Sequence, residues 1–121
     1  MSGAAGSDER RPFLFLWTSD PGREEEQPGD PGIHEWLAEG DAKGAWQTGD
    51  PVAGASEARS VVRRGSEVIV TDGPFPEFKE WFYGFDVVLA RDIDEAVDYA
   101  SRHPLARHGR AYVLPTVAME D

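Results

Sequence analysis

A chain of 121 residues, of which 40% are hydrophobic and 11% aromatic, has room for one domain with a compact core, so its composition excludes a disordered protein. Cysteine is absent, which excludes disulfides, thiolate catalysis and cysteine zinc sites. The 23 acidic residues outnumber the 12 basic residues and give a formal net charge of -11, which argues against binding to nucleic acid or to anionic membranes.

The first eleven residues are small, polar and charged, and we expect a disordered tail over residues 1–11 ahead of a single domain over residues 12–121. This tail lacks the apolar segment that a signal peptide needs. The longest apolar run, residues 13–17, is far shorter than the roughly 20 residues that span a bilayer. We therefore expect a soluble, cytoplasmic protein.

In the first half of the chain, the apolar run Phe13–Trp17 predicts a strand that is buried on both faces. Residues 20–32 then combine proline, glycine and glutamate, and nothing apolar offsets the entropy lost on ordering them. We expect these residues to form a mobile loop that acts as a lid over a pocket near Trp17 and Asp72. A short helix follows to about Lys43, with Asp30 as its N-cap and apolar residues at helical spacing.

The second half begins with a predicted hairpin, whose strands over residues 58–63 and 67–71 flank a turn at Gly65. Residues 82–90 alternate with period two and form the clearest strand. Asp92 then caps a helix that ends near Arg102 and whose apolar stripe comprises Ile93, Ala96, Val97 and Ala100. A last strand is predicted over residues 110–117.

Because strands outnumber helices and the hairpin is antiparallel, this order predicts an α+β fold, an antiparallel sheet with helices packed on one face. A ferredoxin-like arrangement of split β-α-β units fits it. Such a monomer leaves one sheet face exposed, and a homodimer would bury that face.

The segment from Val68 to Glu80 resembles the signature of the YCII-related, or DGPF-domain, family. Residues 72–75 read Asp-Gly-Pro-Phe, and Lys79-Glu80, Gly84-Phe85 and His103-Pro104 follow at the family's spacing. The resemblance implies a dimeric ferredoxin-like fold with a pocket between helices and sheet or near the subunit interface. It also implies that some relatives are small enzymes using a His and an Asp, including dechlorinases of hydroxylated aromatics, and that some are encoded beside sigma factors.

Three residues are candidates for catalysis: His34, Asp72 and His103. Asp72 ends a strand beside Gly-Pro, where a carboxylate either shapes the turn or orients a His or a substrate hydroxyl. Histidines titrate near neutrality. We expect His103 to be an exposed loop residue, and it stands where the family's catalytic branch has an Asp. His34 lies beside Ile33 and could be buried against the sheet.

Candidate substrate-binding residues are Trp17, Phe75 and Asp86. The aromatic residues supply either the core and a dimer interface or a flat pocket. Asp86 interrupts an apolar strand, and we expect it to face solvent or a dimer interface unless it has a role in a pocket. The three histidines lack the spacing of metal ligands, so we expect no metal and no cofactor.

Two functions remain open. One is a non-catalytic module that binds a small molecule near the sheet and helices or at the dimer interface. The other is a cofactor-independent enzyme that uses a His/Asp pair on an aromatic or similar small substrate.

Overall fold

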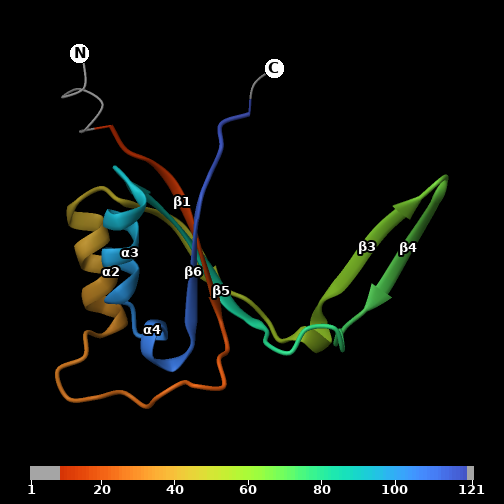
Figure 1. Cartoon of the computed structure of the whole chain (residues 1–121), viewed down its shortest axis with the longest axis horizontal. Coiled ribbons are helices and arrows are strands. Elements are labelled where there is room, and N and C mark those ends of the chain that lie inside the picture. The colour runs from red at the N-terminus through yellow and green to blue at the C-terminus, as the bar shows by residue number, and fades with distance from the viewer. Residues whose placement is uncertain (1–8, 120–121) are drawn as a thin grey trace.

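The structure, a computed structural model, describes residues 9–119. It is an α+β fold in which an antiparallel four-stranded sheet carries its helices on one face. A separate two-stranded hairpin projects away from this sheet and its helices (Figure 1). The sheet has the order β2 (Trp46–Pro51), β5 (Phe82–Ala90), β1 (Arg11–Thr18) and β6 (Arg110–Pro115). The helices are α2 (Ile33–Ala42), α3 (Ile93–Ser101) and the short α4 (Leu105–His108), with a 3-10 turn, η1, at Ala55–Glu57.

The core lies between the sheet and helices α2 and α3. Alternate side chains of β1, namely Phe13, Phe15 and Trp17, are fully buried against the helices. Leu14 and Leu16 between them point to the open face and are only half-buried. The expectation that this strand is buried on both faces is therefore wrong, because no second layer covers the sheet within the described residues.

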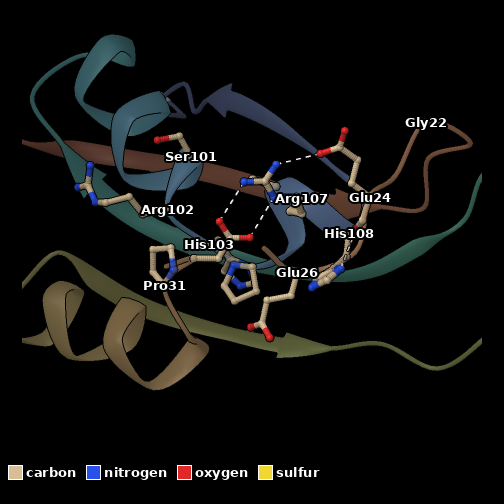
Figure 2. Close-up of a pocket in the computed structure, with 13 residues that line it drawn as sticks. Gly22, Glu24, Glu26, Pro31, Ser101, Arg102, His103, Arg107 and His108 are labelled. Carbon is tan, nitrogen blue, oxygen red and sulfur yellow. Dashed lines mark hydrogen bonds and ion pairs between the residues drawn. The ribbon is translucent and has the colours of Figure 1, made fainter. Parts of the chain in front are cut away.

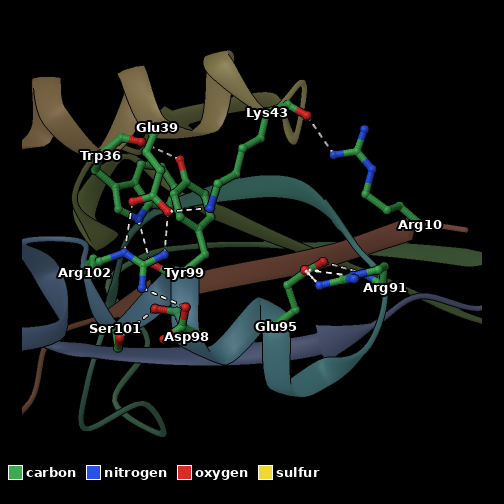
Figure 3. A network of polar contacts seen from close by, with 10 residues as sticks. All are labelled: Arg10, Trp36, Glu39, Lys43, Arg91, Glu95, Asp98, Tyr99, Ser101 and Arg102. Atoms are coloured by element: carbon green, nitrogen blue, oxygen red, sulfur yellow. Dashed lines mark hydrogen bonds and ion pairs between the residues drawn. The ribbon is translucent and has the colours of Figure 1, made fainter. Parts of the chain in front are cut away.

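Helices α2 and α3 are locked together by reciprocal hydrogen bonds (Figure 3). The Trp36 indole N–H donates to the Tyr99 carbonyl oxygen at 2.8 Å, and the Tyr99 hydroxyl donates to the Trp36 carbonyl oxygen at 2.5 Å. Their rings stack with centroids 4.2 Å apart. Arg102 adds ion pairs to Glu39 and Asp98, and its hydrogen bonds hold the pKa of Glu39 at about 2. This lock fixes the end of α3, from which His103 follows.

The N-cap predicted for α3 is the one observed, whereas the N-cap predicted for α2 is not. The Asp92 carboxylate accepts a hydrogen bond from the Glu95 N–H at 2.8 Å, as a cap of α3 should. The cap of α2 is Gly32 and not Asp30, since Arg107 and the Gln27 N–H hold the Asp30 carboxylate. The buried stripe of α3 also differs: its buried members are Ala96, Tyr99 and Ala100, whereas Ile93 and Val97 are exposed.

The predicted hairpin is confirmed as β3 (Arg59–Arg64) and β4 (Glu67–Asp72), joined by a turn in which Gly65 has a φ of 59°. It forms a sheet of its own. At the N-terminus, residues 1–8 of the expected disordered tail lie outside the described residues, and Arg11 already belongs to β1. Within residues 9–119, no helix is long and apolar enough to cross a membrane.

Candidate functional site

Asp86 is a buried carboxylate held by two tryptophans. It lies on the face of β5 that the helices cover, and only 8% of it is exposed. The Trp17 indole N–H donates to Oδ2 and the Trp46 indole N–H donates to Oδ1, each at 2.8 Å. Gly49 of the neighbouring strand makes room, because a Cβ there would lie 2.2 Å from Oδ1. The expectation that Asp86 faces solvent or a dimer interface is therefore wrong, and the pocket alternative stays open.

Within residues 9–119, no cation balances the charge of Asp86. No Lys or Arg of the described chain forms an ion pair with it. Burial raises the pKa of Asp86, and the two indole hydrogen bonds oppose this shift while the nearby Asp50 adds to it. The carboxylate is thus a stronger base than an ordinary Asp and has two fixed donors.

His103 is also buried, contrary to the expectation of an exposed loop residue, with 8% of it exposed. Its ring stacks on Trp17 with centroids 4.0 Å apart and meets Trp36 edge-on at 4.6 Å. Its Nδ1 accepts a hydrogen bond from the Leu105 N–H at 2.9 Å, which leaves the proton on Nε2. Burial lowers the pKa of His103 to about 4, so the imidazole is neutral at physiological pH.

Trp17, Trp46, Asp86 and His103 meet at one cavity of about 490 Å³, which we call the Trp–Asp pocket. Its other lining residues are mostly apolar or aromatic and include Ile33, Leu37, Pro51, Tyr83, Pro104 and Leu105. An apolar cavity of this size with a few convergent polar groups is the usual form of a small-molecule site.

A second cavity, of about 240 Å³, lies under the acidic loop of residues 20–32 and also has His103 on its wall (Figure 2). Arg107 of α4 holds this loop with a bidentate ion pair to Asp30, at 3.0 and 2.9 Å, and a single bond to Glu24 at 2.9 Å. The hydrogen bonds from Arg107 to Asp30, together with the one from the Gln27 N–H, lower the pKa of Asp30. Backbone contacts add to the anchoring, since the Glu24 N–H donates to the Arg107 carbonyl oxygen.

These ion pairs and backbone hydrogen bonds offset the entropy that is lost when the loop is ordered. The expectation that nothing offsets this loss is therefore wrong, because it considered apolar contacts and not charged side chains. His103 and Pro104 line both the cavity under this loop and the Trp–Asp pocket, whereas Asp72 lines neither cavity.

The sequence was compared with known families and proteins. The family model for the YCII-related domain matches residues 12–119. The chain belongs to the YCII-related family. A search of curated proteins found no match.

In this YCII-related chain, three of the six candidate residues lie together and three do not. Trp17, Asp86 and His103 share the Trp–Asp pocket. Asp72 sits at the base of the hairpin, exposed, in an ion pair with Arg59 at 3.1 Å. Phe75 packs near Trp81 beside that base, with ring centroids 5.8 Å apart. His34 is exposed on α2.

Sequence reasoning missed Trp46 and Gly49 as parts of the site. Trp46 was one of four tryptophans with no distinguishing pattern, and its pairing with Asp86 spans 40 residues. Gly49 follows it by three positions in an edge strand, where a glycine indicates close approach of another group. Within residues 9–119, no three His, Asp or Glu side chains are grouped so that they could hold a metal ion.

Proposed function

We propose that this YCII-related protein binds a small, flat, largely apolar molecule in the Trp–Asp pocket. The observation that carries the proposal is the presence of two buried ionisable groups, Asp86 and His103, on the wall of one apolar cavity. Burial of a carboxylate without a cation costs free energy, and groups with strongly shifted pKa values gather at functional sites.

The polar groups define the ligand's chemistry. No described residue accepts a hydrogen bond from His103 Nε2–H, so this donor is available to a ligand oxygen. Asp86 offers the remaining lone pairs of its carboxylate as acceptors. A hydroxyl on an aromatic ring can satisfy either group, while the ring packs against the indoles and Leu37.

The test uses the four indole N–H signals in a nitrogen–proton NMR spectrum. Addition of 2-naphthol is expected to shift the signals of Trp17 and Trp46, which contact Asp86, and to leave that of Trp81 near the hairpin unchanged. Naphthalene, which lacks the hydroxyl, is expected to bind at least about tenfold more weakly, the value of one hydrogen bond to a charged group. Asp86→Asn should reduce the difference in affinity between 2-naphthol and naphthalene, and the exposed Asp72→Asn should leave it unchanged. Absence of any shift at saturating 2-naphthol would refute the proposal.

A second candidate function is acid–base catalysis, and the opposite pKa shifts of the two groups favour it. The raised pKa of Asp86 suits it to accept a proton from a ring hydroxyl, and the neutral His103 can donate a hydrogen bond to the oxygen that becomes charged. This pair differs from the predicted pairing of a histidine with Asp72, which lines neither cavity.

The catalytic candidate is tested by hydrogen–deuterium exchange at C1 of 2-naphthol in heavy water. Removal of the hydroxyl proton activates that carbon, which takes a deuteron from solvent and then releases its proton. The wild type should accelerate the exchange and Asp86→Asn should abolish the acceleration. Exchange no faster than in buffer, with binding intact, would leave only the binding function.

We also infer that the fold is ferredoxin-like and that the chain is a homodimer. Two β-α-β units, β1-α2-β2 and β5-α3-β6, interleave in the sheet order β2-β5-β1-β6, which supports the first inference. The open sheet face supports the second, because it carries a continuous set of apolar side chains: Leu14, Leu16, Phe85, Val87, Leu89, Tyr112 and Leu114. The expected cytoplasmic location stays a prediction.

A further inference from the structure

The hairpin of β3 and β4, residues 59–72, projects away from the rest of the molecule, and we call it the arm (Figure 1). It is apolar on both faces. The register places Val61 opposite Val70 on one face and Val62 opposite Ile69 on the other. Exposure reaches 67% at Val61 and 55% at Val70.

Such an element is not stable by itself. A two-stranded hairpin alone in water is marginal at best, and it gains stability when its apolar face packs on something. Neither strand of the arm pairs with the main sheet. Clustered apolar side chains of this kind on a surface mark a site of interaction.

The base of the arm is nevertheless built tightly. The Gly73 N–H donates to the Ala58 carbonyl oxygen at 2.8 Å. A Cβ on Gly73 would lie 1.9 Å from the Ala55 carbonyl oxygen, so only glycine fits there. Next to it, Trp81 packs near Phe75 and Phe78, with centroids 5.8 and 5.6 Å away. These contacts close the base of the arm, and its valines lie beyond that base.

Charge indicates the kind of surface that the arm meets. Residues 59–72 contain three basic side chains (Arg59, Arg63, Arg64) and two acidic ones (Glu67, Asp72), a net charge of +1. The whole chain has -11, so the remainder has -12. Because the arm carries a small net positive charge and the rest of the chain is strongly acidic, a second copy of the same chain is an electrostatically complementary partner.

The surface area available for burial also favours a second copy of the chain as the partner. Four strands about 4.8 Å apart and about 20 Å long make a sheet face of about 400 Å², only half of the roughly 800 Å² that each partner of a stable complex buries. Each face of the arm adds about 200 Å² by the same spacing. In a two-fold pair each subunit gives one arm and receives another, which brings the buried area to about 800 Å² per subunit.

We propose that the arm is a dimerisation arm, which lies against a second copy of this chain while the open sheet faces pack together. The proposal rests on the homodimer inferred above and names the element that completes its interface. It is independent of ligand binding in the Trp–Asp pocket.

Sedimentation velocity of the full chain tests it with Val61→Glu/Val70→Glu. Val97→Glu is the matched control, since Val97 is 48% exposed on α3, on the helix side of the sheet. The wild type and the control should sediment at twice 13.3 kDa, and the arm variant should dissociate at least tenfold more readily. A wild type that is monomeric at 100 micromolar would overturn both the homodimer and the arm. If the wild type is a dimer and the arm variant dissociates no more readily, the role of the arm is refuted and the homodimer stands.

A second measurement covers the case in which the glutamates unfold the arm. The chain has no cysteine, so Val70→Cys gives a single attachment point for a photoreactive maleimide. Irradiation should yield a covalent dimer from the label at position 70 and not from Val97→Cys. Cross-linking that is equal at both positions, or absent at position 70, would refute the proposal.

Discussion

The buried imidazole of His103 should make the stability of the protein depend on pH. Burial lowers the pKa of His103 from 6.5 to about 4, so the folded protein binds this proton less readily than the unfolded chain. The stabilising contribution is complete above pH 6.5 and is lost as the pH falls toward 4. With these two values, linkage gives a loss of about 2 kcal/mol in the free energy of unfolding between about pH 7.5 and about pH 5.

Asp86 acts in the opposite direction and must be separated from this effect. Its pKa is raised in the fold, so the cost of its burial is relieved as the pH falls. The measurement is therefore a difference: urea unfolding of the wild type and of His103→Asn at both pH values. An asparagine at position 103 retains an acceptor near the Leu105 N–H and cannot titrate.

Over this pH range, the free energy of unfolding of the wild type should fall by about 2 kcal/mol more than that of His103→Asn. His34→Asn, a change at an exposed histidine of α2, should follow the wild type. Equal losses in the wild type and His103→Asn would refute the reasoning, since a buried neutral imidazole has to produce the difference.

Three further predictions concern the pocket and the loop. Gly49→Ala should lower the free energy of unfolding by about 1–3 kcal/mol in urea titration, because its Cβ would collide with the Asp86 carboxylate; an unchanged midpoint contradicts this. Trp46→Phe should also cost about 1–3 kcal/mol, since it leaves a buried carboxylate oxygen without its donor, and no loss would show that this hydrogen bond contributes nothing. Arg107→Ala should release the loop near Asp30, so that a glutamate-specific protease cuts there several times faster; cutting at the wild-type rate would mean that other contacts hold the loop.

Most of the fold could be predicted because local patterns decide it. The period-two alternation of residues 82–90 and the Asp92 cap are properties of neighbouring residues, and both predicted elements occur. The cap of α2 failed for a non-local reason. Asp30 has the right chemistry for a cap, but its carboxylate is bound by Arg107, which lies 77 residues away.

The site depended even more on distant contacts. Asp86 and His103 were both singled out, but their burial follows from how β5 and α3 pack, which the composition of their own segments does not reveal. A histidine before a proline is typical of an exposed loop. Here the lock between α2 and α3 brings that loop onto Trp17, so the ring is stacked and desolvated.

The neighbours of Asp86 show why this carboxylate is more than an interruption in a strand. An apolar side chain at this position would avoid the cost of burying a charge, so stability alone does not account for an aspartate. Yet both carboxylate oxygens receive an indole N–H, and Gly49 leaves the space that one of them fills. Three other positions are thus fitted to a group that burial penalises. A carboxylate that is held in one orientation on the wall of an apolar cavity is already arranged for a ligand, and this is the physical reason to look for the ligand there.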